Sequence, residues 1–263
     1  MIKGDKVKIY ILASGSKGNM TYIKTNHQNF FIDAGISYLK VKQKMLAYQE
    51  DIQKVDTLLL THEHHDHTMG LKVLLKQGFI KTIYLTAGTY QALSPEVKAI
   101  FPKQIIIIKA DTDFQMGSFL VTPFMMSHDA VEPVGFVLKG EDKKIVLITD
   151  TGYIDQAYQP LLTDADLYIV EANHHPVKLM NSPRPFHLKK RILSEKGHLS
   201  NEDACWLMNQ WIKTKTSIWV VAHMSEDCNT IIDVEEAIVQ YFDDPTKVIT
   251  YYASILGLPG IEL

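Results

Sequence analysis

The sequence has few features of a secreted or membrane protein. It contains two cysteines, Cys205 and Cys228, in 263 residues, which are too few for a disulfide framework. No uninterrupted apolar run approaches the roughly 18 residues that a membrane-spanning helix needs. The opening segment, residues 1–6, is polar and lacks the apolar centre of a secretory signal peptide. We therefore expect a cytoplasmic protein with no membrane partner.

Internal repeats, low-complexity tracts and long linkers are also lacking. With 46% hydrophobic residues, the chain can bury a full core, and layered α/β folds often reach this length as one unit. We expect a single domain over residues 1–263. The net charge of −3 excludes an overall basic field, so a protein of this composition that binds nucleic acid needs a local basic patch.

The most informative feature that is present is the decapeptide Thr-His-Glu-His-His-Asp-His-Thr-Met-Gly at residues 61–70. His62, His64, Asp66 and His67 place four potential metal ligands within six residues. Imidazole and carboxylate together suit Zn²⁺, Mn²⁺ or Fe²⁺. Apolar segments precede and follow the motif, which predicts a strand, a ligand-bearing turn and a helix. A loose His-rich tail would lack this framing.

One short motif cannot supply every ligand of a paired metal site. A catalytic zinc ion takes about three protein ligands, and two ions about 3.5–4 Å apart require a bridging carboxylate. His128, Asp150 and His223 each follow an apolar stretch, and the carboxyl ends of buried strands are where binding clefts form. A single histidine in such a place is commonly a core residue. The three residues together with the motif favour a metal site.

The order of these seven residues resembles the metallo-β-lactamase-fold hydrolase superfamily. Six further segments resemble its single-domain YycJ/WalJ-type branch, which consists of bacterial cytosolic 5′-to-3′ DNA exonucleases: residues 12–19, 30–35, 149–153, 171–174, 197–201 and 222–225. His175 departs from that branch, where an aspartate is expected. The resemblance implies an α/β (α+β) protein with a four-layer αββα sandwich. It also implies two divalent metal ions, Zn or Mn with Fe possible, and DNA as the substrate.

The same resemblance implies a role for each candidate ligand. The first ion is held by His62, His64 and His128, the second by Asp66, His67 and His223, and Asp150 bridges the two.

Two groups are candidates for acid–base catalysis. Asp66 would also orient the attacking water and accept its proton. His198 would protonate the leaving oxygen with Glu171 as its partner, as in related nucleases of this fold. The alternatives are that His198 starts a helix and bonds to backbone, and that Glu171 is an exposed carboxylate at a strand end.

Several other polar or aromatic residues have two interpretations each. Asp33 either supports a metal-bound imidazole or caps the following helix. The glycine-rich loop 14–19 either binds an anion through backbone N–H groups or only turns the chain. Trp206 and Trp211 are expected in the core rather than as platforms for bases. His65 is expected to face solvent.

A local excess of positive charge follows the strand at 166–170. Residues 178–196 contain six cations and one opposing residue, Glu195: the cations are Lys178, Arg184, Lys189, Lys190, Arg191 and Lys196. They form either a solvated helix face or a surface that contacts phosphates and makes binding salt-dependent.

The sequence therefore favours a dinuclear-metal-dependent phosphodiester hydrolase, a 5′-to-3′ DNA exonuclease. The alternative is a small-molecule phosphodiesterase or thioesterase on the same scaffold. A diiron oxidoreductase fits less well, because that group typically has glutamate at the position of His64 and carries a flavin domain. A secreted lactamase does not fit the missing leader.

The hydrophobic pattern also predicts the elements that carry these residues. We expect strands at 7–14, 20–25, 30–33, 55–60, 82–86, 104–109, 112–116, 118–126, 134–139, 143–149, 166–170 and 217–222. Helices are expected at 38–48, 68–76, 88–100, 201–212 and 231–242, with Ser200 as the cap of the helix that begins at 201.

Overall fold

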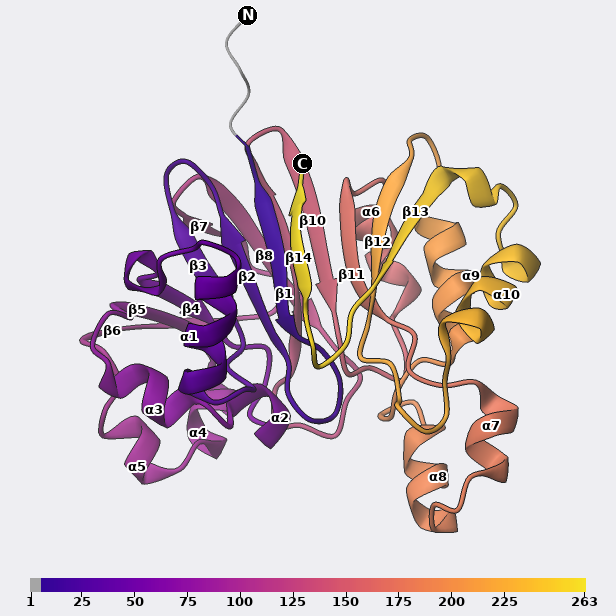
Figure 1. Ribbon diagram of the computed structural model, residues 1–263, viewed down its shortest axis with the longest axis horizontal. Coiled ribbons are helices and arrows are strands. Elements are labelled where there is room, and N and C mark those ends of the chain that lie inside the picture. Colours follow the sequence, from indigo (N-terminus) through magenta and orange to yellow (C-terminus); the bar gives the residue numbers. More distant parts are fainter. Residues whose placement is uncertain (1–5) are drawn as a thin grey trace, which may run out of the picture.

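Two seven-stranded sheets pack face to face, and helices cover the outer face of each sheet (Figure 1). The structure, a computed structural model, describes residues 6–263. The segment 1–5, on which the signal-peptide argument partly rests, lies outside the described residues. The layers are helices, sheet, sheet and helices, so the predicted αββα sandwich is confirmed.

Each sheet combines antiparallel and parallel strands. The first sheet has the order β14 (Leu258–Glu262), β1 (Lys8–Ala13), β2 (Met20–Lys24), β3 (Asn29–Ile32), β4 (Thr57–Leu59), β5 (Thr82–Thr86) and β6 (Gln104–Ile108). The second has the order β13 (Val248–Tyr252), β12 (Ser217–Ala222), β11 (Leu167–Glu171), β10 (Lys143–Ile148), β9 (Val134–Gly140), β8 (Phe119–Met125) and β7 (Phe114–Met116). Strands β3 to β6 and β10 to β13 run parallel. Their carboxyl ends therefore share an edge within each sheet.

The central strands are apolar on both faces because both faces are covered. In β1, Ile9 and Ile11 pack between the two sheets, whereas Tyr10 and Leu12 pack under the helices. Strands β10 and β11 divide their side chains in the same way. Such strands read as continuous apolar runs in the sequence rather than as alternating ones.

Helices cover the first sheet on one side and the second on the other (Figure 1). The first sheet is covered by α1 (Tyr38–Ala47), α3 (Leu71–Lys76), α4 (Ala87–Ala92) and α5 (Pro95–Lys98), and the second by α6 (Gln159–Leu162), α9 (Asn201–Trp211) and α10 (Ile231–Tyr241). Three short helices, α2 (His65–Thr68), α7 (Pro176–Asn181) and α8 (Phe186–Ile192), lie toward one end of the sandwich, where α7 and α8 project as a lobe. The remaining short elements are 3₁₀ turns at Ile52–Lys54, Gln156–Tyr158 and Pro245–Lys247.

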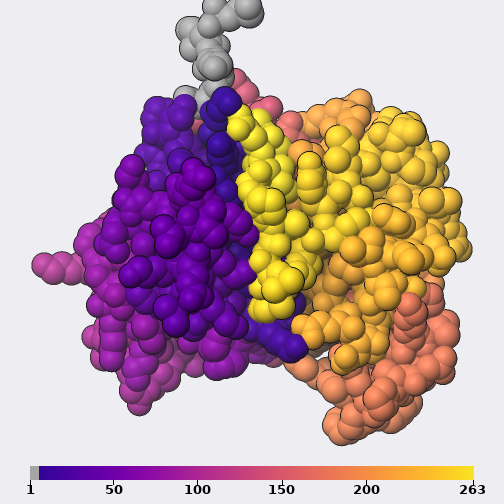
Figure 2. All heavy atoms as spheres, in the orientation of Figure 1, coloured from indigo at the N-terminus to yellow at the C-terminus, as the bar shows by residue number. Residues whose placement is uncertain are grey.

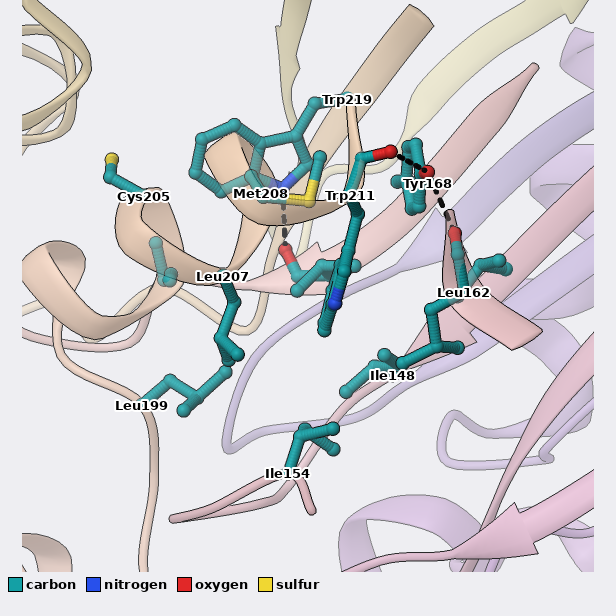
Figure 3. Close-up of a cluster of buried hydrophobic side chains, with 14 of the residues drawn as sticks. Ile148, Ile154, Leu162, Tyr168, Leu199, Cys205, Leu207, Met208, Trp211 and Trp219 are labelled. Atoms are coloured by element: carbon teal, nitrogen blue, oxygen red, sulfur yellow. Dashed lines mark hydrogen bonds between the residues drawn. The ribbon is translucent and has the colours of Figure 1, made fainter. Parts of the chain in front are cut away.

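Helix α9 shows how capping and packing fix one element. Ser200 Oγ accepts a hydrogen bond from Asp203 N at 3.1 Å, which confirms the predicted N-cap. Trp211 is 2% exposed and lies against Tyr168, with ring centroids 6.1 Å apart (Figure 3). Trp206 is 45% exposed, so its predicted core position is wrong. Trp206 lies on the outer face of the helix, outside the buried stripe that Ala204, Met208 and Trp211 form.

Some boundaries differ from the prediction. Strand β4 spans Thr57–Leu59 instead of 55–60, and α2 and α3 are separated at Gly70 instead of forming one helix over 68–76. Strands β13 and β14 were not predicted. Strand β14 pairs with β1 although the two lie at opposite ends of the chain, and it runs along the junction between the N-terminal and C-terminal halves (Figure 2). Among the described residues, no helix is long and apolar enough to cross a membrane.

Candidate metal centre and adjacent histidine–glutamate pair

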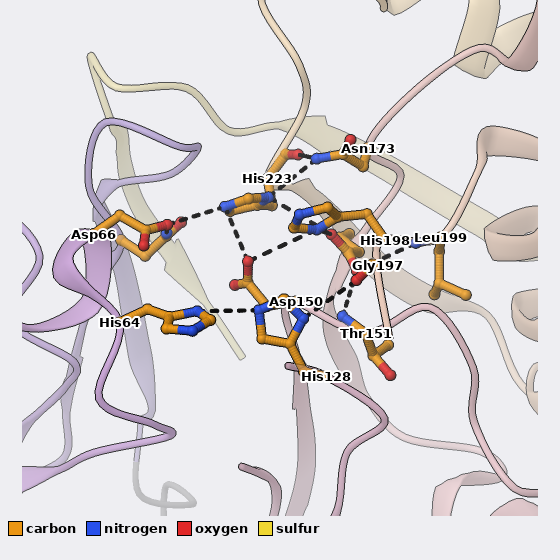
Figure 4. A network of polar contacts seen from close by, with 12 residues as sticks. His64, Asp66, His128, Asp150, Thr151, Asn173, Gly197, His198, Leu199 and His223 are labelled. Atoms are coloured by element: carbon orange, nitrogen blue, oxygen red, sulfur yellow. Dashed lines mark hydrogen bonds and ion pairs between the residues drawn. The ribbon is translucent and has the colours of Figure 1, made fainter. Parts of the chain in front are cut away.

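All seven predicted ligands converge at the end of the sandwich where both sheets present carboxyl ends of parallel strands. Figure 4 labels His64, Asp66, His128, Asp150 and His223 among them. The potential ligand atoms form two groups, each with all of its atoms within 4.8 Å of one another. The first group is His62, His64 and His128, and the second is Asp66, His67, Asp150 and His223. Asp150, which the resemblance places between two ions, lies in the second group only. Glu171, His198 and His223 form a third group that shares His223 with the second.

The turn that carries the decapeptide is held by backbone contacts with the residue before β2 and with the segment after β3. The carbonyl of Asp66 accepts from Asn19 N at 2.7 Å, and the carbonyl of His67 accepts from Ala34 N at 2.8 Å. A Cβ atom on Gly35 would lie 1.7 Å from the Asp66 carbonyl oxygen. Only glycine allows the two segments to approach this closely, so Gly35 helps to position Asp66 and His67.

Three polar residues that follow buried strands have left-handed backbone conformations. Asp33 follows β3 with φ 62°, Asp150 follows β10 with φ 64°, and His223 follows β12 with φ 49°. This conformation is uncommon for residues other than glycine and is most accessible to Asn, Asp and His. The abrupt change of direction at each strand end turns the side chain toward the centre, at the cost of local backbone strain.

The donor atoms of the first group fit a metal cation. His62 Nε2 is buried and has no hydrogen-bond partner among residues 6–263. His128 Nδ1 faces the carbonyl oxygens of Lys196 and Gly197 at 3.1 and 3.3 Å, which places its proton on Nδ1 and a lone pair on Nε2. That Nε2 atom lies 3.2 Å from His64 Nδ1. Convergent imidazole lone pairs suit a borderline divalent ion.

The electrostatics of the two groups also favour cations. Burial lowers the pKa of His62 well below its usual value, so this ring stays neutral at pH 7. Burial acts in the same direction on His67 and His223, but carboxylates outweigh it. Asp33 and Asp150 raise the pKa of His67 well above its usual value, and Asp150 is the main group that raises the pKa of His223 to about 9. Divalent ions would displace these protons on binding.

Asp33 holds the candidate ligand His67 in place by a hydrogen bond. Its Oδ2 accepts from His67 Nδ1 at 2.7 Å, and its Oδ1 accepts from Thr61 N at 2.9 Å. This contact fixes the ring so that Nε2 points toward the other candidate ligands. The alternative prediction, that Asp33 caps α1, is wrong because Ser37 accepts the hydrogen bond from Lys40 N.

The glycine-rich loop 14–19 closes against the centre. Asn19 Nδ2 lies 3.1 Å from Asp66 Oδ2 and 3.0 Å from His67 Nε2. Ser14 Oγ accepts from His223 N at 2.8 Å. Neither contact was predicted from the sequence, where this loop had two interpretations, an anion site or a simple turn. The signal was available, since Asn19 ends a segment that resembles the YycJ/WalJ-type branch.

His198 lies beside the centre (Figure 4) and pairs with Glu171. His198 Nδ1 lies 3.0 Å from Glu171 Oε2 and 3.7 Å from Asp150 Oδ1. Glu171 is 0% exposed, so the interpretation of it as a surface carboxylate is wrong. Its Oε1 also accepts from Thr151 N at 2.7 Å. Because Ser200 caps α9, His198 is not the helix-start residue.

Acidic residues from distant segments pair with part of the basic stretch 178–196. Lys178 pairs with Asp233 at 2.6 Å, Arg184 with Asp227 at 3.4 Å, and Arg191 with Asp129 at 2.5 Å. Glu195 is the only acidic residue within the stretch, but it is not the only acidic residue near it in space. The net positive charge of this surface is therefore smaller than the sequence suggests.

Three other histidines, His65, His174 and His175, lie outside the set of candidate ligands. His65 is exposed, as predicted. His175 caps α7, with its Nδ1 accepting from Val177 N at 3.1 Å. His174 is 1% exposed, and neither of its ring nitrogens has a hydrogen-bond partner in the described chain.

Comparisons with known proteins identify the family of this chain. The family model of a β-lactamase superfamily domain matches residues 28–224. The exodeoxyribonuclease WalJ of Streptococcus pneumoniae is 34% identical over 224 residues, which are 84% of this chain and 83% of that protein. The exodeoxyribonuclease YycJ of Bacillus anthracis is 34% identical over 219 residues, which are 83% of each chain.

Among solved structures, the metallo-β-lactamase-fold protein YhfI of Bacillus subtilis superposes with a TM-score of 0.74 and 16% identity, covering 98% of this chain and 99% of YhfI. At this identity the likeness concerns the fold alone. The family match and the two relatives show more: this chain belongs to the β-lactamase superfamily of metal-dependent hydrolases and, within it, to the family of WalJ and YycJ.

Proposed function

We propose that this protein is a two-metal phosphodiester hydrolase that degrades DNA from its ends as a 5′-to-3′ exonuclease. The observation that carries the proposal is the convergence of seven candidate ligands beside the His198–Glu171 pair. The relatives named exodeoxyribonuclease support DNA as the substrate. We further propose that one domain over residues 1–263 carries the activity in the cytoplasm.

We assign the seven candidate ligands to two ions, with Asp150 shared between them. The first ion would be held by His62, His64 and His128, the second by Asp66, His67 and His223, and both by Asp150. When bound, the ions would activate water for attack and neutralise the charge on the phosphate oxygens. The all-nitrogen and oxygen donor set suits Zn²⁺, Mn²⁺ or Fe²⁺, and we propose Zn or Mn.

Asp66 is the candidate that orients the attacking water. One of its oxygens is engaged, because Oδ2 lies 3.1 Å from Asn19 Nδ2 and 3.4 Å from His223 Nε2. The side chain is 22% exposed, so it borders the space where a substrate would enter. A carboxylate in this position can accept the proton that the water loses as it attacks phosphorus.

His198 is the candidate general acid. The buried carboxylate of Glu171 accepts a hydrogen bond from His198 Nδ1 at 3.0 Å. This leaves the Nε2 proton for the oxygen that departs from phosphorus. The same carboxylate holds the backbone of Thr151 and Leu199, so the pair is fixed in place before substrate arrives.

A cleft next to this pair suits an anionic substrate. It has a volume of about 160 Å³ and is lined by Arg184, Arg191 and Ser16 together with His198 and His223. Arg184 also contacts Ser225 Oγ at 3.2 Å. Guanidinium groups at the wall of a cleft are the usual way in which a protein binds the phosphates of a nucleic acid.

A panel of substrates tests the proposal. The protein loaded with Zn²⁺ or Mn²⁺ is incubated with 5′-phosphorylated duplex DNA, single-stranded DNA, RNA and bis(p-nitrophenyl) phosphate. We expect mononucleotides to be released from the 5′ end of DNA. Hydrolysis of the small ester alone would favour a small-molecule phosphodiesterase, and hydrolysis of none of the substrates would reject phosphodiester chemistry.

A further inference from the structure

A second cleft borders the candidate metal centre on the side of His128, away from the His198–His223 cleft. Its volume is about 380 Å³, and its lining includes Met125, His128, Tyr153, Tyr158 and Lys196. His128 thus belongs to both the cleft and the first group of candidate ligands. If the scissile phosphate of a substrate lies at the candidate metal centre, the neighbouring group of the same substrate would reach this cleft.

Close backbone packing builds this cleft. A Cβ atom on Gly152 would lie 2.2 Å from the Ser194 carbonyl oxygen, so only glycine lets the two segments approach. Gly152 N donates to the carbonyl of Ser127 at 3.1 Å, and Thr151 Oγ1 donates to the carbonyl of Tyr153 at 2.7 Å. The Tyr153 backbone is therefore held in one position between two other segments of the chain.

The lining combines exposed apolar surface with an available cation. Tyr153 is 48% exposed and Met125 is 62% exposed, and within residues 6–263 the Tyr153 side chain makes no hydrogen bond or ring contact. Tyr158 is held in the wall, because its hydroxyl accepts from Met125 N at 3.2 Å. Lys196 is exposed and makes no ion pair with any described residue, unlike the paired cation Arg191.

The carboxylate in the lining is already engaged. Asp155 accepts from Ala157 N at 2.9 Å and caps the 3₁₀ turn that follows. A large exposed aromatic ring, a flexible thioether and a free ammonium group are the components with which proteins bind unpaired nucleotides. The ring stacks on a base, and the cation contacts the backbone phosphate.

We propose that this cleft binds one nucleotide of the substrate strand next to the scissile phosphate, with the Tyr153 ring stacked on the base and Lys196 on the adjoining phosphate. The inference rests on the proposed function, because it takes single-stranded DNA as the occupant. It assigns a role to Tyr153, the last residue of segment 149–153. Tyr153 is not one of the candidate metal ligands.

The first test measures binding and hydrolysis with Tyr153→Ala and Tyr153→Phe. The metal-loaded protein is titrated with a 3′-fluorescein-labelled single-stranded oligonucleotide, and Kd is read from fluorescence anisotropy. We expect Tyr153→Ala to raise Kd about 5- to 100-fold and Tyr153→Phe to stay within about twofold. Tyr251→Ala is the matched control, because Tyr251 is 41% exposed but lies on β13 outside this cleft.

A series of oligonucleotides with one abasic position identifies the bound base. When the base next to the scissile phosphate is missing, the Kd of the wild type should rise about as much as Tyr153→Ala raises it on the intact strand. The Kd of Tyr153→Ala should be the same for the abasic and the intact strand. Equal Kd values for wild type and Tyr153→Ala on the intact strand overturn the inference, as does a lack of wild-type binding. Wild-type binding without hydrolysis would reject the proposed function instead.

A salt titration tests Lys196 separately. Removing one phosphate contact from a single-stranded complex reduces the slope of log Kd against log salt concentration by about 0.7. We expect this reduction for Lys196→Gln, with the thermal midpoint of unfolding unchanged. An unchanged slope would contradict the assigned contact between Lys196 and the phosphate.

Discussion

Two buried carboxylates act in the same way on two imidazoles of this site. Asp33 accepts from His67 Nδ1 at 2.7 Å, and Glu171 accepts from His198 Nδ1 at 3.0 Å. In each pair the carboxylate holds the ring through Nδ1, so that Nε2 is the atom directed to the centre or to substrate. The difference lies in the environment: His67 is completely buried among the candidate ligands, whereas His198 lines an open cleft.

Replacing His198 with Ala tests this difference. We expect turnover of DNA to fall about a hundredfold or more, because the leaving oxygen loses its proton donor, while the metal content stays at the wild-type level. Single-turnover rates and metal analysis by mass spectrometry measure the two quantities. His65→Ala is the control, since His65 is exposed within the same decapeptide and should keep full activity. Loss of a metal ion from His198→Ala would make His198 a ligand instead of an acid.

Buried His174 links stability to pH. Burial is the main reason why its pKa falls to about 4, with Glu171 opposing the shift and His198 adding to it. Between pH 6.5 and 4 the unfolded chain carries this proton and the native chain does not. Stability that is complete above pH 6.5 is therefore lost as pH falls through this window.

We expect His174→Leu to lose less stability on acidification than the wild type. The difference should reach about 3 kcal/mol by pH 4, because each pKa unit corresponds to about 1.36 kcal/mol. Urea unfolding of metal-free protein at pH 7 and pH 4 measures it. His187→Leu, at an exposed histidine, should follow the wild-type profile, and parallel pH profiles for His174→Leu and wild type would contradict the prediction.

At the scale of elements, the site depends on loops that pack on one another more than on the strands that precede them. The loop 14–19, the segment after β3 and helix α2 share backbone hydrogen bonds through Asn19 N, Ala34 N and Gly70 N. Each strand only brings its last residue to the edge of the sheet. Local left-handed geometry and interlocking turns then determine where the side chain points.

Gly35→Ala tests the packing of these turns. The new Cβ would meet the Asp66 carbonyl, so α2 has to move. We expect a loss of about 1–3 kcal/mol in the free energy of unfolding and a weaker affinity for metal, measured by urea unfolding and by titration with a Zn²⁺ indicator.

Gly78→Ala provides the control for Gly35→Ala. It lies outside the site with φ 78° and no atom within 4 Å of the new Cβ, so it should cost about 1–2 kcal/mol through backbone strain without changing metal affinity. Unchanged metal affinity in Gly35→Ala would contradict the prediction, because it would show that α2 can move without displacing the candidate ligands.

At the scale of the whole molecule, the candidate ligands connect the two sheets. The decapeptide follows β4 of the first sheet, whereas His128, Asp150 and His223 follow β8, β10 and β12 of the second. Bound ions would therefore bridge the two halves at this end. Strand β14 connects them further, since it follows β13 of the second sheet and pairs with β1 of the first (Figure 2).

Removing metal should therefore lower global stability as well as activity. At an ion concentration 100 times Kd, each site stabilises the native state by about 2.7 kcal/mol, so we expect a chelator to lower Tm on the order of 10 °C. Differential scanning fluorimetry with and without EDTA, followed by addition of Zn²⁺ or Mn²⁺, measures the shift. Asp150→Ala should show a much smaller response to EDTA. An identical Tm for wild type with and without chelator would contradict the bridging of the halves by metal.

The sequence by itself determined the chemistry of the centre. The decapeptide concentrates four potential ligands in six residues, and ligand chemistry depends on residue type, which is fully written in the sequence. His128, Asp150 and His223 were found because buried strands are recognisable as apolar runs and their ends are where polar ligands gather. The αββα architecture was implied by the resemblance that the ligand order carries.

Only the tertiary structure decided the features that depend on distant segments. Glu171 is buried where the segments after β10 and before α9 donate hydrogen bonds to it. Half of the cations in 178–196 have acidic partners at 129, 227 and 233. Strand β14 forms only because β1 offers it an edge, and Trp206 is exposed because its helix face turns away from the sheet. Burial, pairing and exposure are properties of contacts between residues far apart in the chain, so no local pattern of residue types records them.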